Sequence, residues 1–171
     1  MTASRVHLKP TDVTFLIDTR EQRPLDLETA CKGSTYTVKR ATLSTGDYSV
    51  AGLECDGVTV ERKSLDDLVA CVGRERDRFE NELRRMAGFR ARLVLVESLY
   101  SDCEGGGWRS QVKPAAVVGS IMRWQQWGVP FMFAGTREAA ARYACNYLWL
   151  AARAEWERLR MFDKQIRVGN N

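Results

Sequence analysis

Three carboxylates and one lysine could act together in this sequence, because each lies at or near the expected start or end of a strand. Alternate side chains of a strand point to the same side, so Glu61 and Lys63 of the segment Val58–Lys63 share one face. Asp47 begins the preceding strand and Asp18 ends the first one, so all three carboxylates are expected beside Lys63. Two carboxylates about 4 Å apart repel by roughly 4 kcal/mol at an effective dielectric of about 20. The group therefore needs a cation or a proton to persist.

Oxygen ligands without histidine or cysteine favour Mg²⁺ or Mn²⁺ as that cation. Such a metal, with free positions for water and a phosphate oxygen, lowers the pKa of the water and stabilises charge on a phosphodiester during hydrolysis. Lys63 would orient the attacking water, help to deprotonate it, or neutralise the transition state. Each residue alone also has a structural interpretation: Asp18 as the partner of Arg20 or Arg23, Asp47 as a turn residue, and the Glu-x-Lys pattern as charges on a solvated edge strand.

The strands that must position these residues are read from β-rich runs between turn signals. Val13–Asp18 is a nearly continuous apolar run that ends in an acid, which is typical of a buried strand opening into a loop. Tyr36–Thr42, Gly46–Val50 and Val58–Lys63 follow, and we expect these three strands to form a meander. Two further strands are expected at Arg92–Glu97, buried on both faces, and at Val129–Ala134.

Four helices are expected between and after these strands. Ser64 caps the first, the second stops at Gly88, the third opens at Pro114 and reaches about Trp127, and Thr136 caps the last. The segment 101–107 is expected to be a loop, because it contains three consecutive glycines. The predicted fold class is α/β, a mixed β-sheet flanked by α-helices.

Composition narrows the classes of protein that remain. With 171 residues the chain is expected to form one domain, and a formal net charge of +4 does not by itself indicate nucleic-acid binding. The five cysteines are widely spaced without a Cys-x-x-Cys pair, and His7 is the only histidine, so neither a zinc site nor a disulfide framework is expected. Met1–Asp12 lacks an apolar signal core and no apolar run could span a bilayer, so a cytoplasmic protein without membrane contact is expected.

Four segments occur in the order found in one family of nucleases. They are Asp18-Thr-Arg-Glu21, Gly46-Asp47-Tyr48, Val60-Glu61-Arg62-Lys63-Ser64 with Asp67-Leu68, and Leu95-Val96-Glu97. This ordered set resembles the nuclease domain of the XPF family, whose hallmark is a Gly-Asp pair followed, after a variable stretch, by Glu-Arg-Lys. The resemblance covers roughly residues 13–155 and implies the restriction-endonuclease-like form of the mixed sheet. We expect residues 1–171 to be a single XPF-type nuclease domain with no helix-hairpin-helix domain.

The resemblance also implies roles for individual residues. Mg²⁺ or Mn²⁺ would be bound by Asp47, Glu61 and the main-chain carbonyl of Arg62, with Asp18 and Glu21 completing the acidic site and Lys63 acting on water. Contacts to DNA would come from Arg20, Glu21, Arg62 and Arg78. The substrate would be branched or flapped duplex DNA in repair, recombination or phage DNA processing. The apolar stripe that contains Trp149 and Trp156 would either cover the core or, as the resemblance implies and we favour, form a homodimer contact through the last helices.

Two other functions stay open. One is a catalytically silent partner that binds DNA or positions an active nuclease, although the intact set of Asp47, Glu61 and Lys63 argues against it. The other is an enzyme of the same fold with another nucleic acid substrate, such as a restriction-like or RNA nuclease. The arginines of Arg74–Arg85 are better explained as a solvated helix face with internal ion pairs than as a basic arm. Glu97 is either an outer part of the site or a surface acid.

Overall fold

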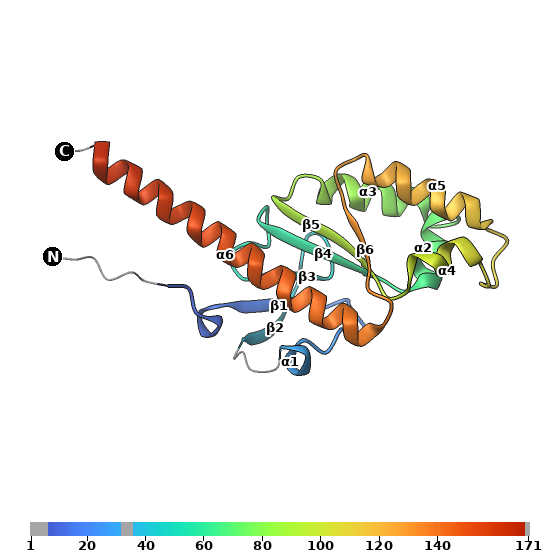
Figure 1. Ribbon diagram of the computed structural model, residues 1–171, viewed down its shortest axis with the longest axis horizontal. Helices are drawn as coiled ribbons and strands as arrows, with labels where there is room; N and C mark the ends of the chain where they lie inside the picture. Colours follow the sequence, from blue (N-terminus) through green and yellow to red (C-terminus); the bar gives the residue numbers. More distant parts are fainter. Residues whose placement is uncertain (1–6, 32–35, 170–171) are drawn as a thin grey trace.

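The strands form one mixed sheet in the order β2-β1-β3-β4-β5-β6 (Figure 1). A computed structural model describes residues 7–31 and 36–169. β1 pairs in parallel with β2 and antiparallel with β3, β3 runs antiparallel to β4, and β4, β5 and β6 are parallel to one another. The strands are β1 (Thr14–Asp18), β2 (Thr37–Ala41), β3 (Tyr48–Val50), β4 (Val58–Lys63), β5 (Ala91–Val96) and β6 (Phe131–Phe133). The predicted mixed sheet is confirmed.

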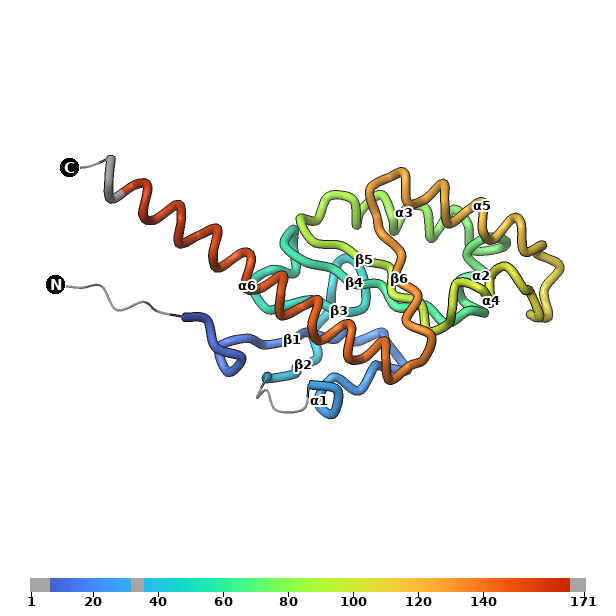
Figure 2. The backbone as a smooth tube through the Cα atoms, viewed as in Figure 1, coloured from blue at the N-terminus to red at the C-terminus, as the bar shows by residue number. Residues whose placement is uncertain are grey.

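Helices cover both faces of this sheet. α6 crosses one face, with the short α1 against it, while α2, α3 and α5 cover the other and α4 packs on α5 (Figure 1). The outer part of α6 extends beyond the sheet (Figure 2). The helices are the 3₁₀ turn η1 (Pro10–Asp12), α1 (Leu27–Ala30), α2 (Leu65–Val72), α3 (Arg76–Met86), α4 (Tyr100–Gly105), α5 (Pro114–Gln125) and α6 (Arg137–Gly169). Ser64 and Thr136 cap α2 and α6 as predicted, because their hydroxyls accept the N–H groups of Asp67 and Ala139.

Alternate side chains of the central strands pack into two separate core clusters, one on each face of the sheet. Leu93 and Leu95 of β5 pack in the cluster under α6, whereas Val94 and Val96 pack in the cluster under α2, α3 and α5. β5 is therefore buried on both faces, as the apolar run predicted. In β4 the residues corresponding to Leu93 and Leu95 are Val60 and Arg62, so Arg62 lies on the α6 side of the sheet and its neighbours Glu61 and Lys63 on the α3 side.

The predicted meander of three strands is wrong in its first strand. β3 and β4 pair, with Tyr48 opposite Val60, but β2 lies beyond β1 at the sheet edge. β2 pairs with β1 in parallel, so the connection that contains α1 must return the chain to the starting end of the sheet. A run of turn residues before Gly46 shows only that the chain reverses, and here it reverses onto the other side of β1.

Part of the expected loop at 101–107 is helical. α4 begins at Tyr100, and the carboxylate of Asp102 accepts the N–H of Leu99 at 2.8 Å, which caps the helix. Cys103 is fully buried and anchors the turn to the core under α5. The helix ends at the glycines, where Gly106 has a φ of +76°.

Cys31 at the end of α1 and Cys145 on α6 form a disulfide, 114 residues apart in the sequence. No disulfide framework was expected from the cysteine spacing, and this one bridge was therefore missed. An odd cysteine count allows one bridge with free thiols left over, and Cys55, Cys71 and Cys103 are free. Spacing could not reveal the bridge because only the packing of α1 on α6 brings the two residues together.

Among the described residues, no helix is long and apolar enough to cross a membrane.

Candidate active site

The residues predicted to do chemistry meet at one edge of the sheet. Asp18 ends β1, Lys63 ends β4, and Asp47 directly precedes β3, which runs antiparallel to both strands. The N–H of Asp18 donates to the carbonyl of Asp47 at 2.8 Å, and the N–H of Asp47 donates to the carbonyl of Val60 at 2.8 Å. Main-chain hydrogen bonds therefore hold the turn before β3 between the ends of its two neighbours.

Two adjoining pockets open at this edge, and we call them together the site cleft. Their volumes are about 280 Å³ and about 480 Å³. The smaller pocket contains Asp18 and Glu61, the larger contains Lys63, and both contain Asp47. The residues shared by the two pockets are Arg20, Glu21, Asp47 and Arg78. The cleft thus brings together the predicted carboxylates, the lysine and several arginines, of which Arg20 and Arg78 line both pockets.

Asp47 and Glu61 are the carboxylates that this environment perturbs most. Burial, together with the charge of Glu61, raises the pKa of Asp47 to about 8. Burial also raises the pKa of Glu61, although the charge of Lys63 opposes that rise. Loss of water and mutual repulsion make the negative charge of both groups costly, so a bound cation would be strongly favoured here.

Lys63 supplies part of that positive charge. Its ammonium contacts the carboxylate of Glu61 and lies 5.2 Å from the centre of the Phe79 ring on α3. Burial is the largest single influence and lowers the pKa of Lys63, but the charge of Glu61, the hydrogen bond to Glu61 and the charges of other neighbours together outweigh burial, so the pKa is raised overall. Lys63 is therefore held as a cation on the α3 side of the sheet, as the alternation along β4 predicted.

The donor chemistry of the cleft fits Mg²⁺ or Mn²⁺. Oδ2 of Asp47 accepts the N–H of Arg62 at 2.7 Å, while Oδ1 has no hydrogen-bond partner within the described part of the chain. No three Asp, Glu, His or Cys side chains of the described residues are close enough to form a complete metal site. The protein would thus offer two carboxylates, Asp47 and Glu61, with main chain, water or substrate oxygens completing the shell, which suits a cation that keeps several waters.

Asp18 lines the cleft but is already fully engaged. Its carboxylate accepts the Arg20 guanidinium at 2.7 and 2.9 Å and the N–H of Leu43 at 2.7 Å. Burial opposes its ionisation, but the hydrogen bonds from Arg20 and Leu43 outweigh burial and lower the pKa of Asp18. Asp18 therefore holds Arg20 at the rim of the cleft, and binding a metal directly would require it to give up these contacts.

Arg62 serves the cleft through its main chain rather than its guanidinium. The side chain lies between Glu21 and Glu97, with N···O distances of 3.2 and 3.3 Å. Arg137 of α6 reaches the same oxygen of Glu97 at 2.7 Å and also donates to the carbonyl of Arg23. Glu97 is therefore an outer support of the site rather than a free surface acid. Glu21 lines the cleft, and the predicted DNA contact by the Arg62 guanidinium would compete with two ion pairs.

Removing Arg137 tests how much this support contributes. We expect Arg137→Ala to lower the free energy of unfolding by about 1–3 kcal/mol, because Glu97 loses one of its two cations and two main-chain carbonyls lose a donor. Urea unfolding followed by tryptophan fluorescence would measure the change. Arg142→Ala, an exposed substitution on the same helix, is the matched control. Equal stability of the two variants would show that the network contributes nothing measurable.

Two supports of Asp47 were not predicted from the sequence. Gly46 has a φ of +76°, and a Cβ there would lie 2.1 Å from Oγ1 of Thr59, so only glycine fits this turn. The N–H of Gly46 donates to Glu82 of α3 at 2.9 Å, which fixes the turn against the helix. Glu82 lies three residues after Phe79, so helical spacing places it near the inward face of α3 and could have indicated it.

Arg78 lies where a substrate phosphate could be reached. Its side chain is 67% exposed, lines both pockets of the cleft and pairs with Glu75 at 2.9 Å. Arg20 is equally exposed on the β1 side. Both arginines present donors to the cleft, which is the arrangement that a phosphate backbone requires. Their roles in DNA binding stay predictions.

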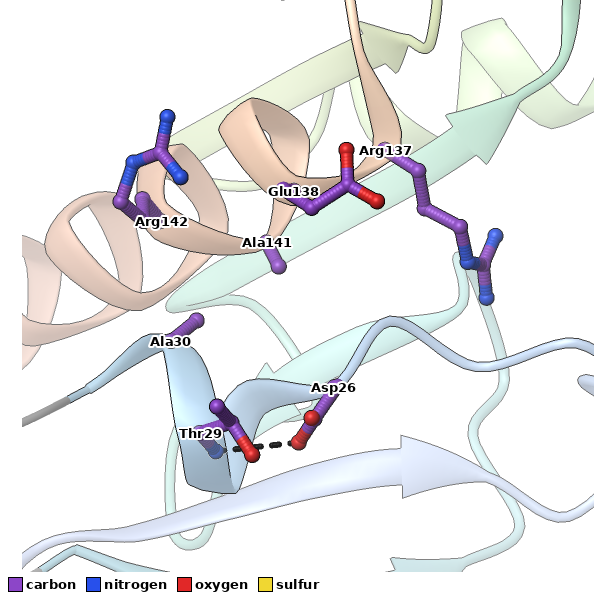
Figure 3. Close-up of a pocket in the computed structure, with 7 residues that line it drawn as sticks. All are labelled: Asp26, Thr29, Ala30, Arg137, Glu138, Ala141 and Arg142. Carbon is purple, nitrogen blue, oxygen red and sulfur yellow. Dashed lines mark hydrogen bonds between the residues drawn. The ribbon is translucent and has the colours of Figure 1, made fainter.

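A larger pocket, of about 630 Å³, lies between α1 and the start of α6 (Figure 3). Two alanines form its middle, and the side chains of Arg137 and Arg142 point in different directions (Figure 3). The hydrogen bond drawn there joins Asp26 to the N–H of Thr29 and caps α1. Its polar groups do not converge on one point, so the site cleft, despite its smaller pockets, is the place for chemistry.

Comparison with known proteins identifies a family and a fold that the chain resembles. The family described as ERCC4 domain matches residues 17–147. Among solved structures, XPF from Aeropyrum pernix is 18% identical with a TM-score of 0.64, covering 89% of this chain and 72% of that chain. XPF from Aeropyrum pernix in complex with DNA is 20% identical with a TM-score of 0.63, covering 82% and 66% of the two chains. No curated protein sequence matches the chain. The resemblance carried by Gly46-Asp47 and Glu61-Arg62-Lys63 is confirmed.

Proposed function

Because the chain belongs to the ERCC4 domain family and has the fold of the XPF nuclease, we propose that it is a metal-dependent endonuclease that hydrolyses phosphodiester bonds in DNA. One observation carries the proposal. The perturbed carboxylates Asp47 and Glu61 share an open cleft with Lys63, and exposed arginines flank them. Strongly perturbed groups that converge in a cleft are characteristic of catalytic sites.

Each residue of the cleft then has a distinct task. Asp47 and Glu61 would hold Mg²⁺ or Mn²⁺, with the Arg62 carbonyl as the further ligand that the resemblance implies. The bound ion would lower the pKa of water and stabilise charge on the phosphodiester. Lys63, charged and next to Glu61, would orient the attacking water and offset negative charge on the phosphate in the transition state. Asp18 would act by holding the guanidinium of Arg20 in position rather than by binding the metal ion directly.

We propose branched or flapped duplex DNA as the substrate, in repair, recombination or phage DNA processing. One of the similar structures is described as a complex with DNA. The exposed cations among the residues that line the cleft are arginines suited to phosphate oxygens, so shape and backbone contacts would provide the recognition.

The experiment that tests the function uses the whole chain on labelled flap, fork, Holliday-junction, linear duplex and single-stranded DNA, with Mg²⁺, Mn²⁺ or EDTA. We expect cutting of branched substrates with either metal and none in EDTA. Binding without cutting in every condition would replace the proposal with a catalytically silent DNA-binding partner. Neither binding nor cutting would remove DNA as the substrate.

We also propose that the chain forms a homodimer through the outer part of α6. Leu159, Phe162 and Ile166 recur at helical spacing on this part and are about half exposed or more, which leaves an apolar stripe uncovered in the single chain. Of the two tryptophans in the stripe predicted from the sequence, Trp149 packs on Tyr36 and so belongs partly to the core. The dimer contact is therefore expected further along the helix.

Light scattering at micromolar concentration measures the oligomeric state directly. We expect a dimer mass for the wild type and a monomer mass for Phe162→Glu, because a charge in the stripe would be buried without a partner. Gln165→Glu, an exposed change on the same segment, keeps the stripe and should stay dimeric. A monomer mass for the wild type contradicts the dimer.

A further inference from the structure

A second groove lies between α2 and the loop that follows α4, and we call it the α2 groove. Its volume is about 580 Å³. The side chains and main chain that form it are Asp66, Val69, Ala70, Gly73, Arg74, Gly107, Trp108, Arg109, Ser110 and Val112. None of the residues proposed for catalysis lies in it, so its features need a separate explanation.

The α2 groove continues the site cleft. Ala70 and Arg74 of the α2–α3 region line both the groove and the larger pocket of the cleft, which also contains Asp47 and Lys63. A polymer bound with one phosphate at the cleft could therefore extend across α2 into the groove without leaving the surface.

The far wall of the groove is a shaped loop with an aromatic side chain. Gly106 and Gly107 have φ values of +76° and +99°, which other residues rarely adopt. Nε1 of Trp108 donates to the carbonyl of Val112 at 2.7 Å, so the indole is fixed while part of it faces the groove. A fixed aromatic side chain in the wall of a groove presents a surface on which a base could stack.

The cations of the groove are available to a ligand. The side chain of Arg74 is 82% exposed, and its nearest carboxylate oxygen, on Glu75, is 3.9 Å away. Arg109 is exposed and has no ion pair among the described residues. Asp66 is the one acid that lines the groove, so with its two arginines the groove carries a net positive charge. Available guanidinium groups next to an aromatic ring favour an anionic polymer with planar bases.

We propose that the α2 groove binds a single-stranded arm of the DNA, leading away from the phosphate that is cut. The inference rests on the proposed nuclease function and adds a second contact to it. A single strand is favoured over a duplex because the groove is concave and has a ring in its wall, and unpaired bases can turn toward such a ring whereas paired bases cannot.

Fluorescence anisotropy in EDTA would test the groove without cleavage. The ligands are a labelled duplex of fixed length that carries a single-stranded arm of zero, four, eight or twelve nucleotides, and the same duplex extended by paired nucleotides. For the wild type we expect affinity to rise with the single-stranded arm. For the double variant Arg74→Ala, Arg109→Ala we expect that gain in affinity to shrink about tenfold. On DNA with a single-stranded arm, the slope of log K against log salt concentration should fall in magnitude by about 1.4, because two phosphate contacts are lost.

Controls keep the outcome specific. Arg123→Ala with Arg142→Ala removes the same charge from exposed sites outside the groove and should keep the full gain from the arm. Trp108→Leu should lose part of the gain without changing the salt slope, with circular dichroism confirming its fold.

An unchanged gain in the double arginine variant overturns the groove proposal while leaving the proposed nuclease function intact. An equal gain from the paired extension overturns the single-strand assignment, and a wild type that neither binds nor cuts DNA overturns both proposals.

Discussion

Asp47→Asn is expected to lower kcat/KM for metal-dependent cleavage by about 10³-fold or more. Asparagine keeps the size of the side chain and can still accept the N–H of Arg62, so the turn before β3 should keep its shape. What it removes is one of the two negative charges that would hold the ion. The same substitution ends the repulsion between Asp47 and Glu61, so the metal-free protein should be no less stable than the wild type.

This difference between activity and stability makes the prediction specific to a metal site. The wild type should gain thermal stability on addition of Mg²⁺ or Mn²⁺, because a ligand that binds only the folded state stabilises it, and Asp47→Asn should lose that gain. Thermal unfolding with metal and with EDTA measures both effects beside the cleavage assay. Asp77→Asn, an exposed change on α3, is the control and should behave like the wild type. A variant that still cuts at the wild-type rate would show that Asp47 is not a ligand.

Lys63→Ala separates the task of the lysine from that of the carboxylates. It removes no ligand oxygen, so the stabilisation by metal should persist, while cleavage should fall by about 10²- to 10³-fold through loss of charge near the attacking water. If the variant loses both the stabilisation by metal and the cleavage, Lys63 acts by holding Glu61 in position rather than by taking part in the chemistry.

The sequence predicted the parts of the site that depend on local geometry. Alternation along a strand depends only on the backbone, so the shared face of Glu61 and Lys63 and the opposite placement of Arg62 were correct. The predicted strand ends at Asp18 and Lys63 likewise coincide with the ends of β1 and β4. The interpretation of Asp18 as the partner of Arg20 is confirmed as well, whereas the hydrogen bond that Asp18 accepts from the N–H of Leu43 depends on the tertiary fold and was not predicted.

The features that were missed depend on which elements pack together. β2 pairs with β1 rather than with β3, and no local sequence pattern shows which of these two strands is its neighbour. Glu82 reaches Gly46 only because α3 lies over the end of β4, and Arg137 reaches Glu97 only because α6 crosses the sheet. These contacts join residues 36 and 40 positions apart, so they follow from the tertiary fold alone.

The same reasoning applies to the Cys31–Cys145 disulfide, whose removal we expect to lower the free energy of unfolding by about 4 kcal/mol. The bridge closes a loop of 114 residues, so its loss gives the unfolded chain much more conformational freedom. For a domain of this size that corresponds to a fall of roughly 8–16 °C in the midpoint of thermal unfolding. The site itself lies on β1, β3 and β4, so cleavage well below the midpoint should continue.

Thermal unfolding of the wild type with and without a reductant, beside the variant Cys31→Ala with Cys145→Ala, measures this contribution. The reductant should lower the midpoint of the wild type and leave that of the variant unchanged, because Cys55, Cys71 and Cys103 form no bridge within the described residues. In a reducing compartment the two cysteines would stay as thiols, so the cleavage of the reduced wild type should also be assayed at low temperature. A wild-type midpoint that does not respond to the reductant would show that the bridge is absent in solution or contributes nothing to stability. Cleavage lost on reduction while the fold persists would instead mean that the anchoring of α1 to α6 reaches the cleft, through Arg137 and the Glu97–Arg62–Glu21 ion pairs.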